Sequence, residues 1–69
     1  MEELIFNIEE AIEGGYTAKA INGEIFTAGD NINELKTNIK DAVLCHFDTG
    51  SIPKIIRMHF VRDEVFALA

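Results

Sequence analysis

The chain has 69 residues, with twelve acidic and six basic side chains and a formal net charge of −6 at pH 7. This length allows one domain with a small core, and the single cysteine, Cys45, excludes an internal disulfide. The acidic balance argues against direct nucleic-acid binding, and no apolar run reaches the roughly 20 residues that a membrane-spanning helix needs.

The same features predict the setting of the protein. One unpaired thiol and no signal peptide are typical of a cytoplasmic protein. A core of this size is marginal without a disulfide or a metal, so we expect a homo-oligomer, a dimer or larger. The sequence indicates no cofactor, no metal site and no membrane contact.

The chain begins with a predicted strand over residues 2–12. Its apolar and polar side chains alternate, which is typical of a half-buried strand, with Leu4, Phe6 and Ile8 on the buried face. Gly14 and Gly15 then permit the positive φ angles of a tight connection.

A second strand is expected over residues 16–21 and a third over residues 24–28. Between them, Asn22-Gly23 is a strong two-residue hairpin signal, because both positions tolerate positive φ in a type I′ turn. The first half of the chain is therefore predicted to be a three-stranded antiparallel meander.

The third strand leads into the only predicted helix, within residues 27–47. Its apolar stripe recurs at spacings of three and four: Ile32, Leu35, Ile39, Ala42, Val43 and Phe47. Gly29 allows the tight backbone between strand and helix. Asp30 and Asn31 are both suitable caps, and Asn31 with Glu34 fits a capping box.

Residues 54–67 are rich in Ile, Val, Phe and Met and predict a long final strand. Ile56, Met58 and Phe60 share one face, whereas Val61 and Val65 share the other. This change of parity near residues 60–62 predicts a bulge, or two halves of the strand covered by different neighbours.

A right-handed crossover would lay the final strand beside the first and parallel to it. We therefore expect one domain over residues 1–69, of α+β class and β-β-β-α-β order, with one helix on one face of a four-stranded sheet. The opposite face is too mixed for a core and too apolar to ignore. We expect its final strand to form a partner or oligomer surface, especially Arg57, His59 and Val61.

Two groups of residues raise the question of chemistry. Cys45 and His46 could in principle bind a metal or act as nucleophile and base, but adjacent residues on a helix point about 100° apart, so neither arrangement forms locally. We instead expect a buried or half-buried thiol and a polar helix-end residue. The strand order is also that of a partial ribonuclease-H-like fold, whose members place carboxylates around two metal ions. Glu9, Glu34 and Asp63 lie near the corresponding elements of this chain. Such a site needs an Asp in the middle of the first strand, where Asn7 cannot supply the charge. We therefore interpret the three as surface carboxylates and expect no catalytic residue.

Several segments occur in an order and spacing that closely resemble the N-terminal domain of HicB-type antitoxins, particularly short single-domain members of bacteria and archaea. They are Gly14 to Ala18, Ile25 to Asp30, Glu34-Leu35, Asn38 to Val43, Cys45 to Phe47, and Pro53 through Glu64. The resemblance implies a non-catalytic protein that oligomerises and neutralises a small, basic ribonuclease toxin of the HicA type by binding it.

Many relatives of that kind add a C-terminal DNA-binding domain. This chain stops at Ala69, so we expect it to lack that domain. Two alternatives stay open: an oligomeric scaffold or regulator of unknown partner, and a metal-dependent nuclease-like remnant on a ribonuclease-H-like half-fold.

Overall fold

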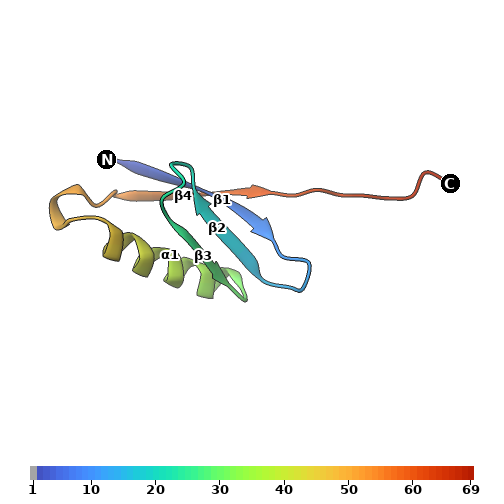
Figure 1. Cartoon of the computed structure of the whole chain (residues 1–69), viewed down its shortest axis with the longest axis horizontal. Helices are drawn as coiled ribbons and strands as arrows, with labels where there is room; N and C mark the ends of the chain where they lie inside the picture. Colours follow the sequence, from blue (N-terminus) through green and yellow to red (C-terminus); the bar gives the residue numbers. More distant parts are fainter. Residues whose placement is uncertain (1) are drawn as a thin grey trace.

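The computed structural model describes residues 2–69 and contains four strands and one helix in the expected order (Figure 1). The elements are β1 (Glu3–Glu10), β2 (Tyr16–Ala20), β3 (Phe26–Gly29), α1 (Ile32–His46), the short 3-10 helix η1 (Thr49–Ser51) and β4 (Ile55–Val61). The predicted α+β class and β-β-β-α-β order are confirmed.

The four strands form one sheet in the order β3-β2-β1-β4. β1 pairs with β2, and β2 with β3, in antiparallel fashion, whereas β4 lies parallel to β1 with Met58 opposite Phe6. The parallel pairing follows from the crossover through α1, which returns the chain to the end of the sheet where β1 begins. β3 and β4 are therefore the two edge strands among the described residues.

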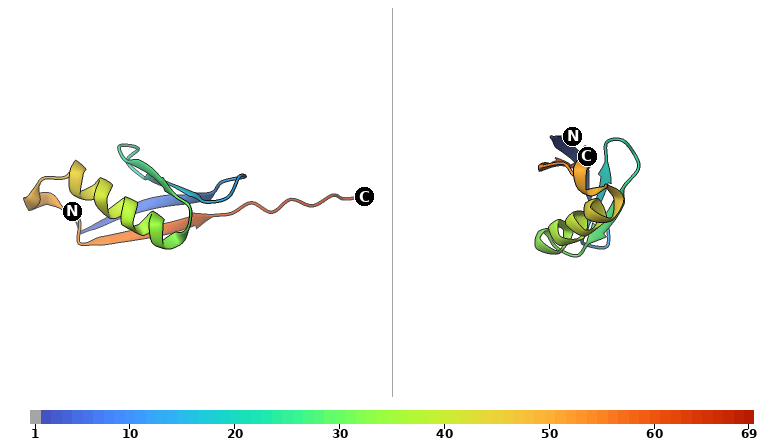
Figure 2. Two further views of the ribbon diagram at one scale, coloured as in Figure 1. Left: turned by 90° about the horizontal axis from the view of Figure 1, so that it is seen from below. Right: turned by 90° about the vertical axis from the view of Figure 1, so that its left-hand side faces the viewer.

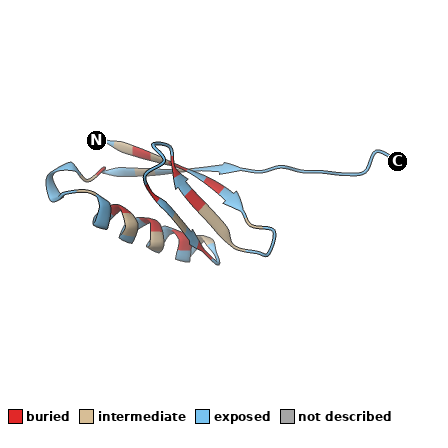
Figure 3. Cartoon of the chain, viewed as in Figure 1, coloured by how far each residue is buried: buried red, intermediate tan, exposed pale blue. Residues whose placement is uncertain are grey.

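The core lies between α1 and one face of the sheet (Figures 2 and 3). The alternation of β1 and the helical stripe both point into it, as their spacing predicts. Its buried side chains are Leu4, Phe6, Ile8, Ala18, Ala20, Ile25, Leu35, Ile39 and Val43. Beyond them, the ring of Tyr16 meets the ring of Phe60 edge to face at 6.4 Å between centroids, where aromatic pairs are favourable.

Of the two candidate caps at the start of α1, Asn31 is the one that caps the helix. Asn31 has an extended backbone (φ −146°), and its Oδ1 accepts a hydrogen bond from the Glu34 N–H at 2.8 Å. This satisfies one of the free N–H groups of the first turn. Asp30 lies one residue too early to do so and is exposed.

Gly29 is needed for a reason other than a positive φ. A Cβ at this position would lie 2.6 Å from the backbone nitrogen of Leu35. The end of β3 therefore passes directly against the first turn of α1, and only a residue without a side chain fits there.

The connection between β1 and β2 agrees with the prediction. Gly14 and Gly15 both have positive φ, +100° and +83°. A Cβ on Gly15 would also lie 2.9 Å from the carbonyl oxygen of Gly29, so this turn packs against the end of β3.

The predicted type I′ turn at Asn22-Gly23 is wrong. Only Gly23 has a positive φ, +78°, and the loop is longer than two residues, because the Ala20 N–H donates to the Ile25 carbonyl at 2.9 Å. Asn22 instead accepts a hydrogen bond from the Glu24 N–H through its Oδ1 at 3.0 Å. This local side-chain bond gives Asn22 a role that needs no positive φ.

The final strand is shorter than predicted, and the expected bulge is absent from it. Pairing with β1 runs without interruption from Glu3–Ile55 to Glu9–Val61. Because β1 ends at Glu10, no strand within residues 2–69 lies beside residues 62–69. They continue away from the body as an extended, fully exposed segment (Figures 1 and 2).

Candidate partner-binding surface

β4 has only one neighbour in the sheet over residues 2–69, so its outer edge is free. Such an edge presents backbone N–H and C=O groups to any strand that approaches it. The two faces of β4 differ in burial. The face towards α1 contains the half-buried Ile56 and Met58, and the face away from the helix is exposed.

Arg57, His59 and Val61 lie at alternate positions of β4 on the face away from α1, opposite Ile5, Asn7 and Glu9 of β1. All three are exposed. The structure therefore brings the predicted surface residues together on one side of an edge strand. We call this side of the whole sheet the open face.

Arg57 is held in place by β1. Its Nη2 donates a hydrogen bond to Oε2 of Glu3 at 2.9 Å. This hydrogen bond and the attraction of the guanidinium lower the pKa of Glu3, and the same contacts raise the pKa of Arg57. The pair leaves no net charge at this position of the open face.

The open face also carries exposed apolar side chains that the sequence analysis did not single out. Ile21, Phe26 and Ile55 are 66%, 68% and 53% exposed. Phe26 lies on this face because it pairs with Lys19, which points away from the helix. The alternation of β2 could have identified Ile21, but the placement of Phe26 depends on the register of β3.

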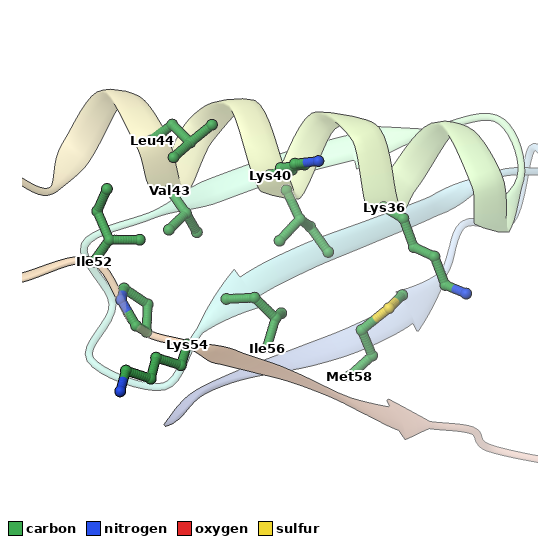
Figure 4. A pocket seen from close by; sticks show the side chains of 10 residues that line it. Lys36, Lys40, Val43, Leu44, Ile52, Lys54, Ile56 and Met58 are labelled. Atoms are coloured by element: carbon green, nitrogen blue, oxygen red, sulfur yellow. The ribbon is translucent and has the colours of Figure 1, made fainter. Parts of the chain in front are cut away.

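On the opposite side of β4, a groove of about 400 Å³ separates that strand from α1. Figure 4 shows Ile56 of β4 facing Val43 of α1 across it, with Met58 further along the groove towards Lys36. Its lining is mainly apolar: Ile39, Val43, Leu44, Ile52, Pro53, Ile56 and Met58. Its polar lining consists of Lys36, Lys40 and Lys54, three of the six basic side chains of the chain.

The groove exists because α1 is fixed over the other half of the sheet. The Asn38 amide donates to the Ala28 carbonyl of β3 at 2.7 Å. At the end of the helix, Nε2 of His46 lies 3.0 Å from Oε2 of Glu24, in the loop before β3. Helix packing is therefore concentrated on β3 and β2, and the helix-facing side of β4 is left partly uncovered.

Cys45 is exposed, so the predicted buried or half-buried thiol is wrong. It follows the buried Val43 by two residues, so its side chain points about 200° around the helix from that of Val43. His46 is a helix-end residue, as expected, and its ring contacts Phe47 edge to face at 5.0 Å.

The acidic residues considered for metal chemistry do not come together. Glu9 and Asp63 line a shallow depression at the end of β1 and β4, whereas Glu34 lies in the first turn of α1. Within residues 2–69, no three His, Cys, Asp or Glu side chains are grouped so that they could hold a metal ion. No helix in the same range has the length and apolar character to cross a membrane.

Comparison with known proteins gives two relatives. A UPF0150 protein of Thermotoga maritima is 45% identical over 67 residues, which cover 97% of this chain and 94% of the relative. A UPF0150 protein of Archaeoglobus fulgidus is 46% identical over 55 residues, 80% of this chain and 82% of the relative. No family model and no solved structure matches the sequence. Since the first similarity extends over nearly the full length of both proteins, the chain belongs to the UPF0150 family.

Proposed function

We propose that this chain is a non-catalytic protein-binding module of the HicB type, which neutralises a small, basic ribonuclease toxin of the HicA type by binding it. The resemblance of residues 14–18, 25–30 and 34–43 to HicB-type antitoxins supports the proposal. The structural observation that carries it is the open face at β4, where Arg57, His59 and Val61 are exposed side by side.

This surface has the composition of a protein-binding site. Exposed Ile55 and Val61 offer apolar contact area on the β4 side of the open face, and Arg57 and His59 beside them permit hydrogen bonds. The net charge of −6 attracts a basic partner during diffusion and raises the association rate at low salt. The Arg57–Glu3 pair supports this role, because it neutralises the arginine that would otherwise repel such a partner.

A second candidate is an oligomeric scaffold or regulator with a different partner. The exposed apolar residues of the C-terminal segment, Val65, Phe66 and Leu68, favour it, because such residues are typical of assembly surfaces. Both candidates require binding of protein, and they differ in what the bound protein does.

The test uses the full chain and a purified small, basic ribonuclease of the HicA type. Calorimetry measures binding at low and moderate salt, and a fluorescent RNA substrate reports whether the bound protein still cleaves RNA. We expect a complex whose affinity falls with salt and whose ribonuclease activity is suppressed. An absence of both binding and inhibition would overturn the proposal, and tight binding without inhibition would favour the scaffold or regulator.

A matched pair of variants locates the surface. Val61→Lys removes an apolar contact from the β4 side of the open face and adds a charge that repels a basic partner. Phe26→Lys makes the same kind of change at the opposite edge, on β3. We expect at least a tenfold loss of affinity, about 1.4 kcal/mol, for the first variant only. The mass of each variant in solution is measured in parallel, so that a loss of self-association is recognised.

A further inference from the structure

The segment after β4 carries apolar side chains that no other part of residues 2–69 covers. Residues 62–69 are all exposed, with Val65, Phe66 and Leu68 at 92%, 82% and 97%. Exposing three such residues within four positions to water is unfavourable in free energy, which indicates that they become buried against another surface.

The groove between α1 and β4 also leaves apolar side chains partly exposed. Its walls are apolar, Leu44 is 50% exposed, and Ile56 and Met58 are only half-buried. It lies directly beside the free edge of β4. An extended segment paired to that edge would therefore close the groove from the side.

The alternation of side chains along the strand selects which residues would enter the groove. Ile56 and Met58 face α1, and successive side chains alternate between faces. If the segment continues this alternation, Glu64, Phe66 and Leu68 belong to the helix-facing side, and Val65 to the open face. A two-fold axis perpendicular to the sheet keeps both helices on the same side and makes the two β4 edges antiparallel. Phe66 and Leu68 of one copy then point into the groove of the other.

The charges of the two parts are complementary. The groove is lined by Lys36, Lys40 and Lys54, which makes it locally basic in an acidic protein. The segment carries Asp63 and Glu64 directly before its apolar residues. Pairing the segment with the groove thus brings carboxylates towards amines as well as apolar groups together.

The length of the segment fits the groove, and its composition opposes a return to its own groove. Eight extended residues span about 26 Å, and a 15-residue helix is about 22 Å long. The segment leaves β4 in the direction of the strand, away from the groove (Figure 1). Residues 62–69 contain no Gly, Pro, Asn or Ser, and Asp63, at the start of the segment, is the one residue among them that favours a turn.

We infer that two copies of this chain exchange their C-terminal segments. Residues 62–68 of each copy add as an antiparallel strand to the free β4 edge of the other. Phe66 and Leu68 fill the partner's groove between α1 and β4, and Glu64 lies towards the lysines of that groove. The exchange is reciprocal and closed, and it joins the two open faces into one surface. It does not depend on the identity of any toxin.

The first test is the mass of the full chain in solution, measured by sedimentation equilibrium over low to high micromolar concentrations. We expect twice the 7.7 kDa of one chain. Phe66→Lys should raise the dimer dissociation constant by a hundredfold or more, because losing a residue at the centre of an interface typically has an effect of that size. Val65→Lys makes a matched change on the other face of the same segment and should raise it less than tenfold. Both residues are exposed in the single chain, so folding is unaffected and circular dichroism checks this.

The second test asks whose groove is filled. In a Cys45→Ser background, Leu44→Cys and Phe66→Cys are introduced into one chain, and disulfides form under mild oxidation. We expect covalent dimers, and fewer of them when Val65→Cys replaces Phe66→Cys. A wild-type monomer at high micromolar concentration would overturn the inference. Equal effects of Phe66→Lys and Val65→Lys, or disulfides formed only within single chains, would do so as well.

Discussion

The side-chain amide of Asn38 donates a 2.7 Å hydrogen bond to the backbone carbonyl of Ala28, and this bond ties the middle of α1 to the edge strand β3. A helix centred on the sheet would lie over β2 and β1 and cover the two edge strands, β3 and β4, evenly. Held at β3, it leaves the helix-facing side of β4 open. One polar contact thus contributes directly to the groove in which we place the segment of a second copy.

Replacing Asn38 tests this tether. Asn38→Ala should reduce the free energy of unfolding by about 1 kcal/mol relative to Asn33→Ala, the typical net value of one hydrogen bond. Asn33 is the matched control, because it is exposed in the same helix and both changes gain similar helix propensity. Thermal unfolding should show a difference of about 4–8 °C. Equal midpoints would mean that the bond does not hold the helix.

The two adjacent cap candidates can be separated by the same measurement. Asn31→Ala removes the acceptor of the Glu34 N–H and should cost about 1 kcal/mol. Asp30→Ala, one residue earlier, should change stability by less than about 0.5 kcal/mol, as is usual for exposed positions without such a role. A larger effect at Asp30 would show that the cap is assigned to the wrong residue.

Gly29 is expected to tolerate no side chain. Gly29→Ala would place a Cβ 2.6 Å from the Leu35 nitrogen, and the required shift of β3 against α1 should cost about 1–3 kcal/mol. Gly50→Ala is the control, because a Cβ there meets nothing within 4 Å. Urea unfolding of both variants checks the comparison, and a fully stable Gly29→Ala would contradict the close approach.

The Glu3–Arg57 pair predicts a pH dependence. The pKa of Glu3 is lowered from 4.5 in the folded chain by the hydrogen bond from Arg57, so ionised Glu3 stabilises the fold above the unfolded pKa. This contribution is lost as the pH falls through the folded pKa. Glu3→Gln should therefore lower the unfolding temperature at neutral pH, and the difference from wild type should vanish well below pH 4.5.

The size of this effect is small, because the pair is at the surface and screened by solvent. Glu13→Gln, in the exposed turn after β1, serves as the control for the removal of one acidic charge. A difference between wild type and Glu3→Gln that persists unchanged into acid would show that the carboxylate is not its source.

Much of the fold could be predicted from local patterns. The alternation of Leu4, Phe6 and Ile8 and the helical spacing of Leu35, Ile39 and Val43 each place apolar side chains on one face within a few residues, and all six are buried. The crossover rule then placed the final strand parallel to the first. The exposed face of β4 with Arg57, His59 and Val61 followed from the same alternation.

The errors have both local and long-range causes. Asn22 takes a side-chain hydrogen bond in place of the positive φ of a type I′ turn. The last strand ends at Val61 because β1, its pairing partner, ends at Glu10. The apolar residues 65–68 have the composition of a continued strand, although no neighbouring strand within the described residues reaches them.

Local spacing was therefore enough to specify the elements, their order and their buried faces, since these follow from a side-chain period of two in the strands and of three to four in the helix. The sideways position of α1, the free edge of β4 and the groove between them arise from contacts across the fold, such as Asn38 with Ala28. No periodicity encodes those contacts, because they depend on where separate elements meet, and they are what shapes the surfaces to which we assign function.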